Sequence, residues 1–210
     1  MHIKNDKNME YIGLKIAISS PYITRHEVEF AGLKYSHQQL SRWTKQGLIR
    51  KIKKGLYVFV DTEKELIVQE LSSLIIEPSY ISLETALSMA GLIPEMVFTT
   101  TCVTTKKPIS YDTYLGKVDY RHVGQSLFFG YNSIQGPNKP YYLAEPEKAL
   151  LDYIYLNASI DNRDAVTELR LDPEGFSKLD QVKIDEYLQV FSNIRMTHII
   201  AQMRKIYALK

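Results

Sequence analysis

The stretch HQQLSRWTKQGLIRKIKKGLYVFV, residues 37–60, decides the fold of the first part of this 210-residue chain. Ser36, which directly precedes this stretch, and Gln39 within it form an S-x-x-Q capping box, which predicts the start of a helix. Apolar residues follow at a spacing of three, and Gly47 is a typical helix stop. The first half of the stretch therefore predicts a short helix that ends at Gly47.

The second half of the stretch predicts a two-stranded hairpin. Residues 48–49 and 56–60 are rich in Leu, Ile, Val and aromatic side chains, as strands are. Between them, Lys53, Lys54 and Gly55 are expected to form the turn. A hairpin with a basic tip that directly follows a short helix is typical of the wing of a winged helix.

Two further helices are predicted before this one. The first covers residues 7–19, where a stripe of small and apolar residues at helical spacing is expected to pack on the core. This stripe consists of Met9, Ile12, Gly13, Ile16 and Ala17. Thr24 and Glu27 form a T-x-x-E capping box for a second, short helix that closes at Gly32. Three short helices with a wing after the third predict a winged helix-turn-helix domain in residues 1–60.

The charge on these elements points to DNA. Leu40 and Trp43 are expected to face the core, so the opposite side of the third helix is polar or cationic. On this helix and at its start, the candidate DNA-binding residues are Ser36, His37, Gln38, Gln39, Ser41, Arg42 and Lys45. On the wing they are Arg50, Lys51, Lys53 and Lys54. Gln and Arg can bond base edges in the major groove, while Lys suits phosphate oxygens.

The net charge of the chain is only +2, but it is unevenly distributed. Residues 1–60 hold eleven Lys/Arg against four Asp/Glu, a net +7, whereas residues 61–210 hold fifteen against twenty, a net −5. Charge runs usually mean only a solvated surface, and an exposed basic hairpin without a partner is the alternative. We favour double-stranded operator DNA as the partner because the three helices, the polar face and the basic wing occur together and in order.

Two later stretches of the chain carry recognisable motifs besides residues 37–60. Residues 80–95, YISLETALSMAGLIPE, contain the pattern S-x-x-[ST]-A-L-x-x-x-G-L. Residues 141–156, YYLAEPEKALLDYIYL, contain the pattern A-x-P-E-[RK]-A-L-x-D. With the G-x-[LI] and G-[VL]-Y steps at Gly47 and Gly55, these three stretches resemble the AbiEi-type antitoxins of bacterial abortive-infection systems, which are type IV toxin-antitoxin systems.

That resemblance implies an N-terminal winged helix that represses the antitoxin's own operon, at an operator with inverted repeats. It also implies a C-terminal domain that counteracts a nucleotidyltransferase-like toxin encoded beside it. In such systems the antitoxin is thought not to need a stable complex with the toxin, so direct contact with the toxin is left open.

Residues 61–210 are expected to form a second domain. One helix is predicted from Thr62 and Glu65 to Pro78, and another opens at Ser82. Four strands are expected at 97–103, 117–123, 126–131 and 140–144. Four later helices are expected, one from Pro146 and three near 161–171, 183–191 and 194–209. The predicted fold class is therefore α+β, with a winged helix-turn-helix, a mixed α/β domain of degenerate nucleotidyltransferase-like fold, and C-terminal helices.

We expect no enzymatic activity, no cofactor and no metal. A working nucleotidyltransferase needs a Gly-Ser pair for the phosphates and paired carboxylates for Mg²⁺, and the sequence has no Gly-Ser dipeptide. Glu145 and Glu147 form E-x-E, but at a helix start, where carboxylates favour the positive end of the helix dipole. Cys102 is expected to be buried and inert, and Arg121 and His122 to be satisfied strand residues.

The N-terminus has no apolar run of signal-peptide length, and no 18 uncharged apolar residues follow one another. We therefore expect a cytoplasmic protein with no membrane partner. Two other functions stay open. One is a ligand-sensing winged-helix regulator without a toxin, and the other is an active nucleotidyltransferase that the winged helix recruits to nucleic acid.

Overall fold

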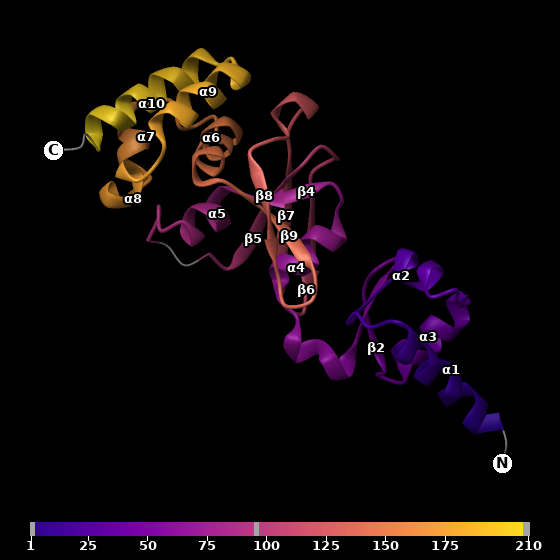
Figure 1. Ribbon diagram of the computed structural model, residues 1–210. Helices are drawn as coiled ribbons and strands as arrows, with labels where there is room; N and C mark the ends of the chain where they lie inside the picture. The colour runs from indigo at the N-terminus through magenta and orange to yellow at the C-terminus, as the bar shows by residue number, and fades with distance from the viewer. Residues whose placement is uncertain (1–2, 95–96, 208–210) are drawn as a thin grey trace.

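The computed structural model describes residues 3–94 and 97–207. Figure 1 shows the first elements at one end of the molecule, a sheet in the middle, and the last helices at the other end. We call residues 3–59 the N-terminal region and residues 60–207 the C-terminal region. The fold is a mixed α and β one, as the sequence predicts, and the N-terminal region has the helix-turn-helix arrangement.

The N-terminal region contains three helices and a small sheet. Its elements are α1 (Ile3–Ala17), β1 (Tyr22–Thr24), α2 (Arg25–Phe30), α3 (His37–Lys45), β2 (Ile49–Lys53) and β3 (Leu56–Phe59). The strands form an antiparallel sheet in the order β1-β3-β2. The predicted second and third helices and the hairpin are therefore present. The first helix ends two residues earlier than expected, and β1 was not predicted.

Both predicted capping boxes form. The Thr24 hydroxyl accepts from the backbone N–H of Glu27 at 3.2 Å, and the Glu27 carboxylate accepts in return from the N–H of Thr24 at 3.0 Å. The pair Ser36 and Gln39 repeats this pattern at the start of α3. Past the end of α3, Gly47 adopts φ +71°, a conformation that favours glycine. These local signals fix where α2 and α3 begin and where α3 ends.

The core of the N-terminal region is built around Trp43, which is fully buried. Tyr11 and Tyr35 meet the Trp43 ring edge-on, at centroid distances of 5.9 and 5.7 Å. From α1 and its end, Leu14 and Ile18 join this core, together with residues of the sheet.

The apolar stripe that we predicted on α1 is therefore wrong. Ile12 is 53% exposed and Ile16 is 79% exposed, and Gly13 and Ala17 are exposed as well. The side chain of Met9 lies outside the described part of the chain. The buried face is instead the neighbouring one, because its aromatic residue Tyr11 packs on both Trp43 and Phe59.

The C-terminal region holds a six-stranded mixed sheet in the order β6-β7-β5-β4-β9-β8. Its strands are β4 (Ser79–Ile81), β5 (Thr99–Thr104), β6 (Ile109–Thr113), β7 (Gly116–His122), β8 (Tyr131–Gln135) and β9 (Pro140–Ala144). The pairs β5–β7 and β4–β9 are parallel, and the other pairs are antiparallel. The helical elements are η1 (Val60–Glu65), α4 (Val68–Ile75), α5 (Leu83–Met89), η2 (Gln125–Leu127), α6 (Pro146–Leu156), α7 (Arg163–Glu168), α8 (Pro173–Ser177), α9 (Gln181–Phe191) and α10 (Ile194–Ile206).

Helices cover both faces of this sheet. Tyr80 and Val103 face one side and share a core with α5, α6 and the later helices. Ile81 and Cys102, each one residue away, face the other side and pack with α4. Because successive side chains of a strand point to opposite faces, neighbouring residues of β4 and β5 belong to two different cores.

Several predicted boundaries in the C-terminal region are wrong. Residues 126–131 do not form a strand, because η2 and an irregular segment precede β8. The helix expected from Thr62 begins only at Val68. The hydroxyl of Thr62, which lies in η1, instead donates to the carbonyl of Phe59 at the end of β3, at 3.1 Å. The Glu65 side chain lies outside the described part. The helix expected near 161–171 is the shorter α7, and α8 and the strands β4 and β6 were not predicted.

The two regions share a hydrophobic core. Tyr22, Leu56 and Val58 of the first sheet pack with Leu71 and Ile75 of α4 in the same cluster.

A buried polar contact reinforces this junction. The Tyr22 hydroxyl donates to the Glu70 carboxylate at 2.6 Å, and the same carboxylate accepts from the backbone N–H groups of Asn138 and Lys139 at 2.7 and 3.1 Å. The sheet of the N-terminal region is thus packed on α4 and on the turn between β8 and β9.

Candidate nucleic-acid interface

One face of α3 carries four of the predicted DNA-binding residues. Gln38, Ser41, Arg42 and Lys45 lie at i, i+3, i+4 and i+7, which places them on one stripe of the helix. Gln38 and Lys45 are exposed, and Ser41 and Arg42 are half-buried. Trp43 lies on the opposite side, in the core. We call these four residues the α3 stripe.

The α3 stripe is tied to α1 through one carboxylate. Glu10 Oε2 accepts from Arg42 Nη2 at 3.1 Å and from Gln39 Nε2 at 3.0 Å. Gln39 Oε1 also caps the helix at Ser36, so both functional groups of its amide are used within the protein. Among the predicted residues at the helix start, His37 is exposed, whereas Ser36 and Gln39 hold the helix in place.

The four cations of the wing do not point the same way. Lys51 and Lys54 are exposed, and Gly55, with φ +83°, completes the turn beside Lys54. The guanidinium of Arg50 instead lies over the ring of Tyr114, 4.9 Å from its centroid, between β6 and β7 of the C-terminal region.

Lys53 is also directed toward the C-terminal region. It belongs to β2 rather than to the turn, and its ammonium donates to the carbonyl of Ile75 at the end of α4. Burial lowers the pKa of Lys53, and the nearby charge of Lys106 lowers it further while Glu77 opposes the shift. The expectation that Lys53 lies in an exposed turn with the other wing cations is therefore wrong. A bulge between Lys51 and Lys53 shifts the register and turns Lys53 to the other face.

Sequence reasoning missed a buried ion pair in the C-terminal region. Lys148 and Asp152, one turn apart on α6, form a salt bridge in which both side chains are fully buried. Asp152 Oδ2 accepts from the hydroxyls of Tyr80 and Ser82 at 2.9 Å each, and Lys148 Nζ also donates to the Tyr80 hydroxyl. The two later family-like stretches, residues 80–95 and 141–156, therefore meet at this pair.

The Lys148 ammonium lies among aromatic rings. It is 5.0 Å from the ring centroids of Phe129 and Phe191 and 5.4 Å from that of Tyr80. Burial lowers the pKa of Lys148 and raises the pKa of Asp152, and each charge opposes the shift of the other. With every polar neighbour already paired, this cluster is a structural element of the core rather than a binding site.

The E-x-E pair at the start of α6 holds α9 in place. The Glu145 carboxylate accepts from the Tyr187 hydroxyl and lies 3.4 Å from Lys183 Nζ. Glu147 Oε1 accepts from the backbone N–H of Asp180, the residue before α9, at 2.9 Å. Neither carboxylate caps α6 with a side-chain hydrogen bond, but Glu145 occupies the N-cap position and Glu147 the first turn, as the dipole interpretation expects. Pro146 does occupy the predicted first position of α6.

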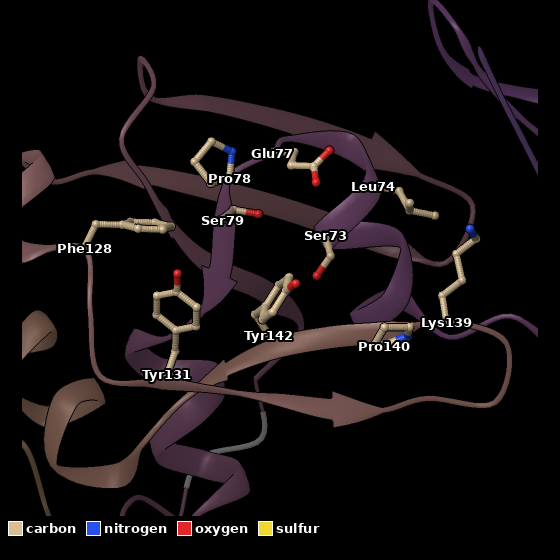
Figure 2. A pocket seen from close by; sticks show the side chains of 10 residues that line it. All are labelled: Ser73, Leu74, Glu77, Pro78, Ser79, Phe128, Tyr131, Lys139, Pro140 and Tyr142. Carbon is tan, nitrogen blue, oxygen red and sulfur yellow. The ribbon is translucent and has the colours of Figure 1, made fainter. Parts of the chain in front are cut away.

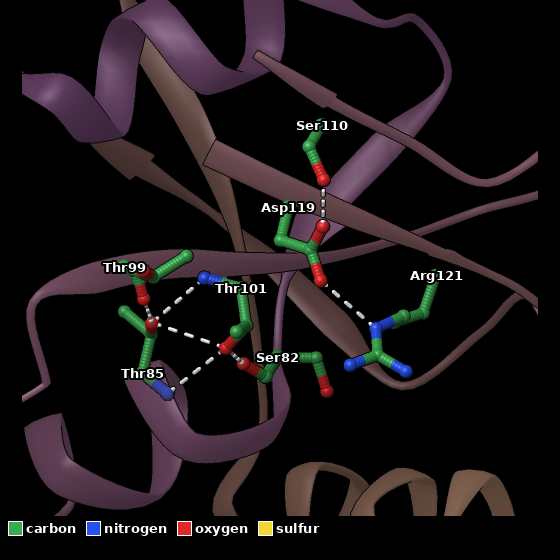
Figure 3. Close-up of polar contacts among 7 residues, drawn as sticks. All are labelled: Ser82, Thr85, Thr99, Thr101, Ser110, Asp119 and Arg121. Atoms are coloured by element: carbon green, nitrogen blue, oxygen red, sulfur yellow. Dashed lines mark hydrogen bonds and ion pairs between the residues drawn. The ribbon is translucent and has the colours of Figure 1, made fainter. Parts of the chain in front are cut away.

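Hydroxyl groups connect β5 to the start of α5 and β6 to β7 (Figure 3). Thr101 Oγ1 donates to the Ser82 carbonyl at 2.8 Å, and its backbone N–H donates to Thr85 Oγ1 at 2.8 Å. Ser82 precedes α5 as predicted, but its hydroxyl bonds to Asp152 instead of capping the helix. Further along the sheet, Asp119 pairs with Arg121 at 2.9 Å.

The remaining candidate chemistry of the C-terminal region is structural. Arg121 is satisfied by Asp119, and His122 Nδ1 lies 3.0 Å from the Lys106 carbonyl. Cys102 is fully buried, and burial raises the pKa of its thiol to about 12, as expected for an inert cysteine. Within residues 3–94 and 97–207, no group of three or more His, Cys, Asp or Glu could hold a metal ion. None of the described helices is long and apolar enough to span a bilayer.

A cavity of about 350 Å³ lies between α4 and the strands β8 and β9 (Figure 2). Figure 2 shows Phe128 and Tyr131 at one end of the cavity, Leu74 and Lys139 at the other, and Tyr142 and Glu77 between them. Lys139 also lines this cavity, and its ammonium lies 2.8 Å from the Glu27 carboxylate of α2. The cavity is thus connected to the helix-turn-helix by one ion pair.

Comparison with known proteins identifies the N-terminal region. Residues 14–60 match the sequence model of a family described as transcriptional regulator, AbiEi antitoxin. The matched segment includes only the last turn of α1, all of α2 and α3, and the whole wing, so the resemblance that we noted in residues 37–60 is confirmed. A search of curated proteins gives no match to this chain.

Proposed function

We propose that this protein represses its own operon and acts as an antitoxin in the cytoplasm. The proposal is supported by the match of residues 14–60 to the sequence model of the AbiEi antitoxin transcriptional regulators. Its target is double-stranded operator DNA, with inverted repeats that two copies of the chain occupy. Its C-terminal region counteracts a nucleotidyltransferase-like toxin encoded next to it, with or without direct contact. The domain boundary we propose is at residue 60, where β3 is followed by η1.

The observation that carries the DNA-binding proposal is the α3 stripe. It presents an amide, a hydroxyl and two cations on one face of the third helix, away from the core. A helix of this kind enters the major groove, where Gln38 can bond adenine and Arg42 can bond guanine. Lys45, Lys51 and Lys54 are exposed and can contact phosphates. His37 and Ser41 are secondary contacts in this proposal.

The contact between Arg42 and Glu10 has a role in this proposal. With 30% and 49% of their side chains exposed, the pair is accessible to solvent, so DNA can compete for the guanidinium. Glu10 thus holds Arg42 in one direction until a base edge or phosphate replaces the carboxylate.

The experiment that tests DNA binding is a salt titration with DNA from upstream of the protein's own reading frame. If about five phosphates are neutralised, log K should fall with log[salt] at a slope of roughly −4 to −5. A response that is flat between 50 and 200 mM salt would contradict the proposal. The matched comparison is a duplex of the same length and scrambled sequence, which should bind more weakly.

The antitoxin role and a nucleotidyltransferase-like fold of the C-terminal region are supported by the family of residues 14–60 and by the mixed sheet with helices on both faces. Co-expression of the full chain with the product of the adjacent gene tests this role, with growth as the readout. The protein should restore growth, and variants of the α3 stripe should restore it equally when both genes are expressed from foreign promoters. Failure of the wild-type chain to restore growth would overturn the antitoxin proposal and leave DNA binding intact.

A second candidate function is ligand-sensing regulation without a toxin. The cavity lined by Phe128, Tyr131 and Tyr142 favours it, because Lys139 links that cavity to Glu27 in α2. Substituting Lys139→Met keeps the side-chain volume and removes the ion pair. If the cavity regulates DNA binding, this variant should change operator affinity while its folding stays intact. Mg²⁺-dependent turnover of nucleoside triphosphates would instead support the third alternative, an active nucleotidyltransferase.

A further inference from the structure

The cavity between α4 and the strands β8 and β9 presents three kinds of chemistry in a fixed order. One end is aromatic, with Phe128 and Tyr131 (Figure 2). Between the ends lie the carboxylate of Glu77 and hydroxyl groups, and the other end holds the ammonium of Lys139. The volume of about 350 Å³ is that of a small-molecule site.

The aromatic end is preformed. The ring of Tyr131 stacks on that of Tyr80, with centroids 4.7 Å apart and an angle of 16° between the two planes. Phe128 and Tyr142 meet the Tyr131 ring edge-on, at centroid distances of 5.3 and 5.7 Å. Because these rings already hold one another in place, a flat ring of a ligand can pack against them without the entropic cost of ordering them.

The middle of the cavity contains a hydroxyl that lacks a hydrogen bond. Ser73 Oγ is buried and has no hydrogen-bond partner among the described residues. A buried polar atom of this kind is costly, and a ligand that bonds to it removes that cost. Glu77 is exposed, and its carboxylate oxygens can accept hydrogen bonds from hydroxyl groups of a ligand. The middle of the cavity therefore suits a sugar.

The cationic end is held in place and is connected to the helix-turn-helix. Glu70 Oε1 accepts from the backbone N–H of Lys139 at 3.1 Å, and a Cβ at Gly136 would lie only 2.4 Å from the same oxygen, so the turn requires glycine there. The Lys139 ammonium lies 2.8 Å from Glu27 Oε1. The other oxygen of the Glu27 carboxylate accepts from the backbone N–H of Thr24 and so closes the capping box of α2.

We infer that this cavity binds a nucleoside monophosphate, with the base at the aromatic end, the ribose against Ser73 and Glu77, and the phosphate on Lys139. A base stacks on aromatic side chains, a carboxylate accepts from ribose hydroxyls, and a lysine ammonium binds phosphate as a point charge. Base, ribose and phosphate follow one another in the ligand in the same order as the three kinds of chemistry in the cavity.

The nucleotide also regulates DNA binding, because its phosphate competes with Glu27 for Lys139. Loss of this ion pair removes a contact that holds α2 against the C-terminal region, and the phosphate adds negative charge near the helix-turn-helix. Both effects lower the affinity for operator DNA. This regulatory step rests on the proposed DNA-binding function, and it names the class of ligand for the ligand-sensing candidate.

The first experiment measures binding to the full-length protein by calorimetry. The probes are the adenosine, guanosine, cytidine and uridine 5′-monophosphates, the nucleoside of the best binder, and ribose 5-phosphate. The best nucleotide should bind more tightly than its nucleoside and than ribose 5-phosphate by about ten-fold or more, because only the nucleotide uses both ends of the cavity. Equal binding of ribose 5-phosphate would mean that the ammonium merely attracts an anion, and would overturn the inference. Absence of binding by all four nucleotides would overturn it as well.

Variants assign the parts of the ligand to the parts of the cavity. Lys139→Met should lower the affinity for the nucleotide to that for the nucleoside and leave the affinity for the nucleoside unchanged. Glu77→Ala should reduce the preference for the ribonucleotide over its 2′-deoxy form. The matched control is Lys178→Met, which removes an exposed ammonium just after α8, at the far end of the molecule (Figure 1). Thermal denaturation checks that each variant is folded, and equal nucleotide affinities for the two lysine variants would contradict the phosphate assignment.

The second experiment measures operator binding with and without saturating nucleotide. The nucleotide should weaken operator binding by about 5–150-fold, the usual range of allosteric coupling, and the operator should weaken nucleotide binding by the same factor. In Lys139→Met the nucleotide should leave the operator affinity unchanged, because the ion pair with Glu27 is already absent. A nucleotide that binds the wild type without any effect on operator affinity would show that the regulatory step is wrong.

The outcomes separate this inference from the proposed function. If the wild type binds operator DNA but no nucleotide, the inference is wrong and the proposed DNA binding stands. If it binds a nucleotide but no operator DNA, the DNA-binding proposal and the regulatory step are wrong, whereas the nucleotide site stands.

Discussion

Helices α3 and α6 each carry two charged side chains one turn apart. These side chains reach the surface on α3, whereas they are buried on α6. On α3 only Trp43 is buried, and the cations Arg42 and Lys45 reach the surface. On α6 most side chains are buried, including the ion pair of Lys148 and Asp152. The comparison teaches that a charged motif in the sequence can mark a binding surface or a buried support, and that burial decides between the two.

The largest effect is expected on α6. Asp152→Ala should lower the free energy of unfolding by about 3–5 kcal/mol, because it leaves the Lys148 ammonium buried without a counter-charge. Chemical denaturation measures this change. The control is the double variant Lys148→Met/Asp152→Leu, which removes both charges and should be much less destabilised than the single one. A loss below about 1 kcal/mol for Asp152→Ala would show that the pair is not isolated from water.

The next effect concerns the junction between the two regions. Burial alone would raise the pKa of Glu70, but hydrogen bonds from Asn138, Tyr22 and Lys139 outweigh it and hold the pKa below its usual value. A lowered carboxyl pKa contributes stability above the unfolded value of about 4.3, and this contribution is lost as pH falls through the folded value.

Glu70→Gln should therefore lower the free energy of unfolding by about 1.5–3 kcal/mol at pH 7, as expected for the loss of hydrogen bonds to a charged group. The variant should also lose less stability than the wild type below about pH 4.3. Denaturation curves at several pH values measure both effects. Parallel pH profiles for the two proteins would contradict this account of Glu70.

On α3 the effect should appear in binding rather than in stability. Arg42→Ala should weaken operator binding by about 1–3 kcal/mol and should weaken binding to scrambled DNA less, because a base contact carries sequence information. Lys51→Ala and Lys54→Ala should weaken both duplexes alike. Fluorescence anisotropy with the two duplexes measures these ratios, and equal losses for all three variants on both DNAs would mean that α3 does not read bases.

The smallest effect is expected for Glu10→Ala. A partly exposed ion pair contributes about 0.2–1 kcal/mol to stability, so the variant should fold almost as well as the wild type. It should bind scrambled DNA more tightly, because it removes a negative charge beside the α3 stripe. Tighter binding to the operator by the same factor would suggest that Glu10 acts only through its charge, whereas a loss of operator preference would indicate that it positions Arg42.

Local signals explain why much of the N-terminal region could be predicted. A capping box needs only four residues, and a glycine stop only one, so Thr24, Ser36 and Gly47 mark the starts of α2 and α3 and the end of α3 without knowledge of the rest of the chain. The face of α1 that is buried could not be predicted in the same way. It carries two apolar stripes, and only the position of Trp43 decides that Leu14, not Ile12, is buried.

The errors at the candidate site have a similar cause. The bulge that turns Lys53 toward Ile75 depends on the pairing of two strands and leaves no mark in the sequence of either. Lys148 and Asp152 have the spacing of a surface ion pair on a helix. They are buried because the segment between η2 and β8 brings Phe129 against them and α9 brings Phe191. Strands of three residues, such as β1 and β4, are too short for periodicity to reveal.

The hydrophobic cluster that Tyr22, Leu56 and Val58 share with α4 fixes the orientation of the C-terminal region relative to the helix-turn-helix. In the proposed complex, the C-terminal region cannot rotate relative to the DNA-bound N-terminal region. Helices α9 and α10 would therefore extend from the duplex in one fixed direction. A spacer of about five base pairs, half a helical turn, would carry them to the opposite side of the DNA. In the proposed complex, the spacing between operator and promoter would therefore decide whether this far end of the molecule obstructs an incoming polymerase or points away from it.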